Sequence, residues 1–97
     1  MVDDAEFHPL LLSYAEHLRG SLRLLESAEA RVHGEHLLQT AHDLKGSGGA
    51  YGFQPITETG ALLEESLLSG RPPGEVDENI AMLCLLLRRA IRGIEGL

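Results

Sequence analysis

The sequence predicts an all-α fold, an antiparallel up-down-up-down four-helix bundle. Hydrophobic residues make up 43% of the chain and are rich in Leu and Ala, whereas aromatic residues make up only 4%. This composition favours helices over a sheet. Apolar residues also recur in steps of three and four over four segments, which is the period of an amphipathic helix. With 97 residues the chain has enough apolar side chains for one core, so we expect a single domain over residues 1–97.

The first predicted helix begins near Asp3 or Asp4, either of which could cap it, and runs to about Ala28. Gly20 lies within this segment and marks a candidate kink or break, because glycine is a poor helix former. The apolar stripe of this helix consists of Phe7, Leu11, Tyr14, Leu18, Leu22 and Leu25.

The second predicted helix follows the polar stretch around His33 and Gly34 and runs to Tyr51, because Gly52 stops it. Its inner stripe consists of Leu37, Ala41, Leu44, Gly48 and Tyr51.

Two further helices complete the predicted bundle. Pro55 suits the first turn of the third helix, and residues 69–74 form the clearest loop of the chain. The inner stripe of the third helix consists of Ile56, Gly60, Leu63 and Leu67, and that of the fourth of Val76, Ile80, Leu83, Leu87, Ile91 and Ile94. Arg88, Arg89 and Arg92 lie in the last turns of the fourth helix, where the helix dipole favours positive charge. Four such helices with short connections close most simply as an antiparallel bundle.

The net charge of −7 argues against a nucleic-acid surface, which needs clustered Lys and Arg, and makes a protein partner the expectation. Cys84 is the single cysteine and lies in an apolar run, so we expect it to be buried in a protein of a reducing compartment. The apolar runs fall far short of the about 20 residues that span a bilayer, and the N-terminus lacks a signal-peptide pattern. We therefore expect a soluble, cytoplasmic protein without a membrane segment.

The glycine-rich stretch at residues 41–52 is the most unusual part of the sequence. Gly46, Gly48 and Gly49 should each cost a helix about 1 kcal/mol, so either the helix ends here or bare backbone is needed. A P-loop is excluded because Lys45 precedes the glycines, and the dinucleotide-binding fingerprint fails because Tyr51 stands where its third glycine would be. A plain flexible loop is the remaining simple alternative, although the apolar stripe continues through the glycines.

A helical wheel places His42 roughly 130° from the core stripe, facing outward, with Gly46 and Gly49 on either side of its direction. Bare backbone there would let the active site of another protein approach the imidazole closely. Lys45, the single lysine of the chain, lies one turn from His42. Its ammonium group could screen the charge of a phosphoryl group, an interaction of about 1 to 4 kcal/mol at about 4 Å.

The residues His42-Asp43-Leu44-Lys45-Gly46-Ser47-Gly48-Gly49, followed by Tyr51-Gly52-Phe53, resemble the signature of the histidine-containing phosphotransfer (HPt) family. The resemblance is close from Leu37 to about Glu65 and extends to the other helices in length and pattern. It implies a four-helix bundle of a bacterial phosphorelay in which His42 accepts a phosphoryl group from a receiver aspartate or a histidine kinase and passes it to a response-regulator receiver domain.

The resemblance also implies that Glu64, on the next helix, holds the second ring nitrogen of His42. A carboxylate there would fix the imidazole tautomer and stabilise the phosphorylated ring. No acidic pocket for Mg²⁺ is apparent, so we expect a phosphoryl carrier without a cofactor or ATP site of its own, with Mg²⁺ in the partner receiver domain. The candidate receiver-docking residues around His42 are Leu38, Gln39, Gly46, Gly49 and Phe53.

The same residues bear on other functions. A helical bundle that binds a receiver or kinase without being phosphorylated is the main alternative. His33 and His36 are too few for a metal site, and Ser47, adjacent in the motif, cannot form a hydrolase triad with His42 and Asp43, because neighbouring residues on a helix point in different directions. Ser47 is assigned to packing. The expected oligomeric state is a monomer. The chain is either a free-standing protein, which the count of four helices favours, or the phosphotransfer part of a longer kinase.

Overall fold

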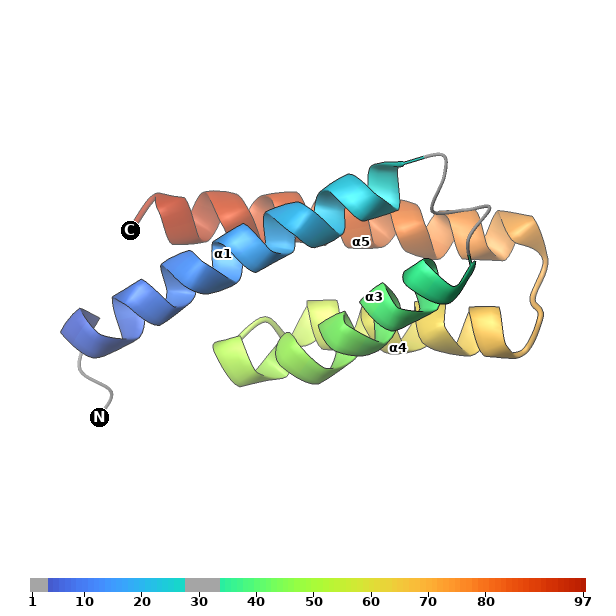
Figure 1. Cartoon of the computed structure of the whole chain (residues 1–97), viewed down its shortest axis with the longest axis horizontal. Coiled ribbons are helices and arrows are strands. Elements are labelled where there is room, and N and C mark those ends of the chain that lie inside the picture. The colour runs from blue at the N-terminus through green and yellow to red at the C-terminus, as the bar shows by residue number, and fades with distance from the viewer. Residues whose placement is uncertain (1–3, 28–33) are drawn as a thin grey trace.

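The structure of the protein is a computed structural model that describes residues 4–27 and 34–97. These residues contain helices and no strand, which confirms the all-α prediction. Figure 1 shows the chain reversing direction from each long helix to the next, as in an up-down-up-down bundle. The elements are α1 (Asp4–Glu26), α3 (Gly34–Ser47), the short 3-10 helix η1 (Gly49–Tyr51), α4 (Gln54–Leu68) and α5 (Pro73–Glu95).

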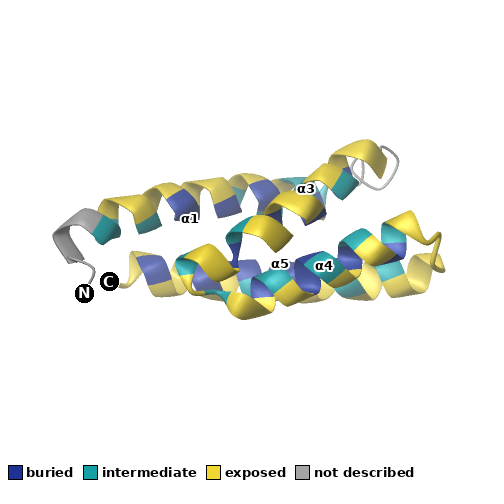
Figure 2. Ribbon diagram, turned by 90° about the horizontal axis from the view of Figure 1, so that it is seen from below, coloured by how far each residue is buried: buried dark blue, intermediate teal, exposed yellow. Residues whose placement is uncertain are grey.

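Helices α1 and α5 pack against each other, α3 packs on α4, and α4 packs on α5, whereas α1 and α3 touch only slightly. Their buried faces point towards the middle of the bundle (Figure 2). The predicted inner stripes supply the core, and Cys84 is buried as expected. The largest fully buried side chains are Leu18, Leu25, Leu44, Ile56, Leu63, Leu83, Leu87 and Ile94. Truncating one such leucine to alanine costs about 2–5 kcal/mol of stability.

Helix α1 is continuous through Gly20, so the kink or break considered at this residue does not occur. Gly20 is exposed, and no atom lies within 4 Å of the position that its Cβ would take. Gly20 therefore lowers the stability of α1 only through its poor helix propensity, and the packing of α1 on α5 offsets this loss. The predicted cap at Asp3 or Asp4 and the predicted end at Ala28 concern side chains or residues outside the described part of the chain.

Helix α3 ends at Ser47, four residues before the end that the sequence predicted. The Gly48 N–H still donates to the Leu44 carbonyl, at 3.0 Å, but the chain then turns into η1. A Cβ at Gly48 would lie 2.7 Å from the Thr57 nitrogen and 2.9 Å from the Phe53 carbonyl oxygen. Bare backbone is thus needed where the start of α4 crosses the end of α3. The helical wheel does not apply to Gly49 because this residue lies beyond α3.

The two remaining connections follow the turn residues of the sequence. Pro55 lies in the first turn of α4, as predicted. Gly70 has a φ of 64°, a left-handed conformation that favours glycine, just after α4 ends. Helix α5 starts at Pro73, so the last two residues of the predicted loop are helical, because proline fits the first turn of a helix. No helix within residues 4–27 and 34–97 is long and apolar enough to cross a membrane.

The four Phe and Tyr residues of the chain gather around the turn that follows α3. Tyr14 of α1 stacks on Tyr51 with ring centroids 4.1 Å apart and on Phe53 at 6.1 Å, while Phe7 stacks on Tyr51 at 6.5 Å. Burial raises the pKa of Tyr14, and its hydroxyl lies 3.2 Å from Ser47 Oγ. Stacked aromatic rings contribute about 0.5–1.5 kcal/mol beyond the area that they bury. This cluster therefore joins the glycine-rich turn to α1.

Candidate functional site

His42 lies on the outer face of α3, where the sequence predicted it. Its side chain is 64% exposed, whereas its neighbours Ala41 and Leu44 on the opposite face are fully buried. The helical period explains this arrangement, because the buried residues hold the inner face of α3 against the core while His42 projects outward. The imidazole is thus accessible to another macromolecule.

A carboxylate of α4 connects the two predicted site residues of α3. Glu64 Oε2 lies 2.7 Å from His42 Nδ1, and Glu64 Oε1 lies 3.0 Å from Lys45 Nζ. The Glu64 side chain is only 15% exposed, so the two contacts hold it at the junction of the helices. The structure therefore brings together His42, Lys45 and Glu64, the three residues proposed from the sequence.

Gly60 allows α4 to come close enough to α3 for these contacts. A Cβ at Gly60 would lie 2.8 Å from the Lys45 nitrogen, 3.1 Å from the Ala41 carbonyl oxygen and 3.2 Å from the Lys45 Cα. All three atoms belong to the backbone of α3, so no side-chain rotation could make room. Glu64 follows Gly60 by one helical turn on the same face, which brings its carboxylate to His42 and Lys45.

The electrostatics of the site keep Glu64 ionised. The hydrogen bond from Lys45 lowers the pKa of the Glu64 carboxyl most, the hydrogen bond with His42 lowers it further, and partial burial opposes both. An ionised carboxylate can only accept a hydrogen bond, so the proton between the two groups is assigned to His42 Nδ1. The other nitrogen, Nε2, makes no hydrogen bond with any described residue, and with the proton on Nδ1 it is the nitrogen that has a free lone pair when the ring is in its neutral form.

A shallow recess of about 510 Å³ lies beside His42 and Glu64. Leu38 and Gln39, two predicted docking residues, line it, and the Gln39 amide also donates to Asp43 within α3 at 2.9 Å. Glu35 and Leu68 also line the recess, although neither was among the docking residues predicted from the sequence. Leu68 is 68% exposed and follows Glu64 by four residues, so the helical period from Glu64 was the signal that could have found it.

The other three predicted docking residues lie outside this recess. Gly46 is exposed, and no atom lies within 4 Å of the position that its Cβ would take. Gly49 lies in η1, where its N–H donates to Thr57 Oγ1 at 2.7 Å. Phe53 is half-buried against Tyr14 rather than turned to solvent. A docking role for these three residues stays a prediction.

Metal binding by a protein requires several His, Cys, Asp or Glu side chains close together. Within residues 4–27 and 34–97, no group of three His, Cys, Asp or Glu side chains could hold a metal ion. His33, which the sequence pairs with His36, lies outside the described residues.

Comparison with known proteins identifies the family. No match was found among curated proteins or among solved structures. The family model of the Hpt domain matches residues 9–94, which include all of α3, α4 and most of α1 and α5. The match, together with the helical bundle and the exposed motif histidine, shows that this chain belongs to the Hpt domain family, whose members serve in histidine phosphotransfer in two-component relays.

Proposed function

We propose that this protein carries a phosphoryl group on His42 Nε2, which it accepts from the phosphorylated aspartate of a receiver domain or from a histidine kinase. It then passes the group to the receiver domain of a response regulator. The observation that carries the proposal is the pairing of an exposed imidazole with an ionised carboxylate. Glu64 holds Nδ1 at 2.7 Å, which leaves Nε2 directed away from its partner.

The transfer follows from the state of the ring. The Nε2 lone pair forms a bond to phosphorus while the bond between phosphorus and the donor aspartate oxygen breaks, and the aspartate leaves as a carboxylate. Nδ1 keeps its proton, so the ring becomes formally cationic, and the Glu64 carboxylate stabilises that charge. In the forward transfer a receiver aspartate attacks phosphorus and the electron pair of the N–P bond returns to Nε2.

Lys45 is proposed to balance the charge of the phosphoryl group. Its ammonium group binds Glu64 at 3.0 Å, one turn along α3 from His42, and its side chain is 47% exposed. At this exposure its attraction for a phosphoryl oxygen lies towards the lower end of the range of about 1–4 kcal/mol at 4 Å. Lys45 is thus a positioning and screening residue rather than a proton donor.

The partner is proposed to supply the rest of the machinery. Phosphoryl transfer needs an in-line arrangement and a cation that neutralises the developing charge. A receiver domain with its bound Mg²⁺ would provide both on approaching the outer face of α3. Leu38 and Leu68 in the recess beside His42 would offer it an apolar contact.

Phosphorylation of His42 is tested by incubating the protein with phosphorylated receiver domains and, separately, with histidine kinases and ATP. We expect acid-labile, base-stable label on the wild type and on His36→Gln, a matched control on the same helix, and none on His42→Gln. Label that persists in His42→Gln would assign the phosphoacceptor to another residue. Absence of label on the wild type with several donors, together with unchanged binding of a receiver by His42→Gln, would favour an adaptor that binds without being phosphorylated.

A further inference from the structure

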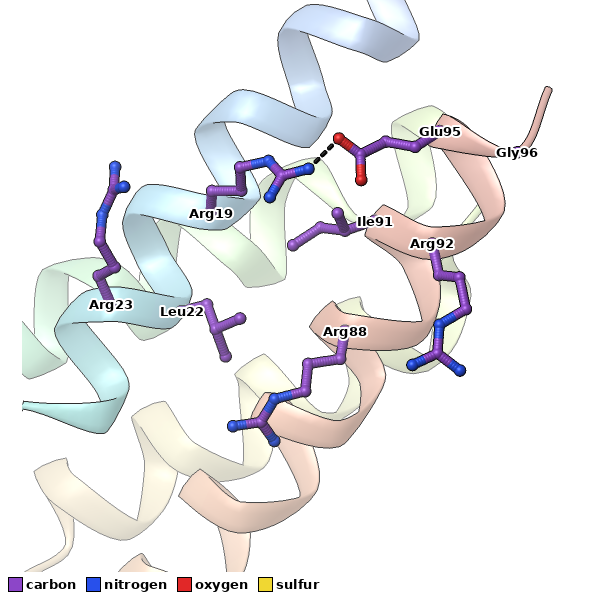
Figure 3. Close-up of a pocket in the computed structure, with 8 residues that line it drawn as sticks. All are labelled: Arg19, Leu22, Arg23, Arg88, Ile91, Arg92, Glu95 and Gly96. Carbon is purple, nitrogen blue, oxygen red and sulfur yellow. Dashed lines mark hydrogen bonds and ion pairs between the residues drawn. The ribbon is translucent and has the colours of Figure 1, made fainter.

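Four of the six arginines that the structure describes line one groove between α1 and α5, which we call the arginine groove. Arg19 and Arg23 come from α1, and Arg88 and Arg92 come from α5 (Figure 3). Leu22 and Ile91 lie between them, and the groove has a volume of about 610 Å³. The chain as a whole has a net charge of −7, so this local concentration of positive charge runs against the rest of the sequence.

Only two of these four arginines form ion pairs between the helices. Arg19 pairs with Glu95, and Arg88 pairs with Glu26, so these two guanidinium groups fasten α1 to α5. Arg23 and Arg92, by contrast, form no ion pair with any residue in the described ranges, and both are exposed. Exposed surface charge attracts a partner of opposite sign within about 10 Å at moderate salt.

The directions of the arginines distinguish between kinds of anion. Figure 3 shows the side chains of Arg23 and Arg92 pointing away from each other, on the outer sides of α1 and α5, while that of Arg88 reaches across the space between the two helices. The three guanidinium groups therefore do not converge on one point, as binding of a single small anion by all three would require. Leu22 is half-buried and Ile91 is 7% exposed, so an apolar strip separates the outer charges. This arrangement suits an extended ligand with separated negative charges and an apolar group between them.

The length of the groove limits the ligand. Its part on α5 runs from Arg88 to Gly96, and eight residues of helix span about 12 Å. About four residues of extended peptide cover the same distance at roughly 3.3 Å each. We propose that the arginine groove binds a short acidic segment of a partner protein, with carboxylates at Arg23 and Arg92 and an apolar side chain over Leu22 and Ile91.

The arginine groove is separate from the phosphotransfer site and does not depend on its proposed function. His42 and Glu64 lie on α3 and α4, and no residue lines both the groove and the recess beside His42. In Figure 3 the ribbons of α3 and α4 lie behind α1 and α5, so the groove opens away from them. A partner held in the groove would leave His42 open to a receiver domain.

The binding test uses the full chain labelled with ¹⁵N and a capped peptide of sequence Glu-Glu-Leu-Glu-Glu, followed by nuclear magnetic resonance. We expect the largest shifts in residues 19–23 and 88–96, and weaker binding as salt is raised. The peptide Gln-Gln-Leu-Gln-Gln, which has no charge, should not bind. The double variant Arg23→Gln/Arg92→Gln should weaken binding of the acidic peptide by about fivefold, as expected for two exposed ion pairs.

A second double variant controls for net charge. Arg71→Gln/Arg89→Gln also removes two exposed arginines, neither of which lines the groove, and should bind as the wild type does. Equal binding of the acidic peptide by both double variants, or shifts centred outside the groove, would overturn the proposal. Tripolyphosphate that binds the groove more tightly than the peptide would also overturn it, because a small phosphate compound would then be the ligand.

Discussion

Substitution of Gly60 by alanine tests whether the close approach of α4 to α3 builds the phosphotransfer site. The added Cβ would lie 2.8 Å from the Lys45 nitrogen, closer than carbon and nitrogen atoms can approach without repulsion. Because the atoms that it meets belong to the backbone, α4 must move away from α3. Glu64 would move with α4, away from the imidazole of His42, and phosphotransfer should slow.

The magnitude follows from a comparison with Gly20→Ala. Both substitutions replace glycine within a helix, so both gain about 1 kcal/mol of helix propensity. At Gly20 nothing lies within 4 Å of the new Cβ, so this gain should appear as increased stability. At Gly60 overpacking costs about 1–3 kcal/mol. The free energy of unfolding of Gly60→Ala should therefore lie about 1–3 kcal/mol below that of Gly20→Ala.

Urea denaturation followed by far-ultraviolet circular dichroism measures this difference, and the rate of phosphoryl transfer to His42 measures the effect on the site. Equal stability of Gly60→Ala and Gly20→Ala would refute the close-approach argument. Transfer at the wild-type rate by a destabilised Gly60→Ala variant would show that the spacing of α3 and α4 supports the fold but not the chemistry.

Three further predictions concern the site itself. Glu64→Ala should slow phosphoryl transfer on the order of tenfold without abolishing it, because the imidazole of His42 loses the group that orients it. Substitution of its exposed neighbour, Glu65→Ala, should leave the rate unchanged. Equal rates for the two variants in a transfer assay would remove Glu64 from the site. Gly46→Leu should stay folded, since nothing lies near its Cβ, but should impede a receiver domain; normal transfer would contradict the need for bare backbone at this position. The pKa of Glu64 is lowered in the folded state, so its contribution to stability is present above the ordinary value of 4.5 and is lost as pH falls through the lowered pKa. Urea denaturation of the wild type and of Glu64→Gln, measured between about pH 7 and pH 2, checks this expectation. The difference in their free energies of unfolding should shrink only below about pH 4.5. A difference that stays constant over this range would show that the ionised Glu64 carboxylate is not stabilised by its partners.

Much of the fold could be predicted because helical periodicity is local information. The stripe of α5, from Val76 to Ile94, identified its buried face, and the outward direction of His42 followed from the buried positions of Ala41 and Leu44. The end of α3 was predicted four residues too late. Its apolar period continues to Tyr51, but the crossing of α4 at Gly48 turns the chain earlier, and that crossing has no signal in the local pattern.

The resemblance of the motif, together with helical spacing, also predicted that His42, Lys45 and Glu64 belong to the site. The contact between Lys45 and Glu64 was not anticipated, since Lys45 was expected only to screen a phosphoryl group. Glu64 accepts hydrogen bonds from both residues because its two oxygens lie between them. Leu68 was not anticipated either. It lines the recess beside His42 because it is a residue of α4 that faces α3.

The sequence by itself therefore determined the helical segments, the buried stripes and the exposed histidine, since each depends on residues within a few turns of one another. Only the tertiary structure decided which residues from different helices meet. Glu64 reaches His42 across 22 positions because Gly60 lets two backbones approach, and the arginine groove forms because α1 and α5, at opposite ends of the chain, pack side by side. Such contacts depend on the register and spacing between helices, which close packing sets and which the period of a single helix does not contain.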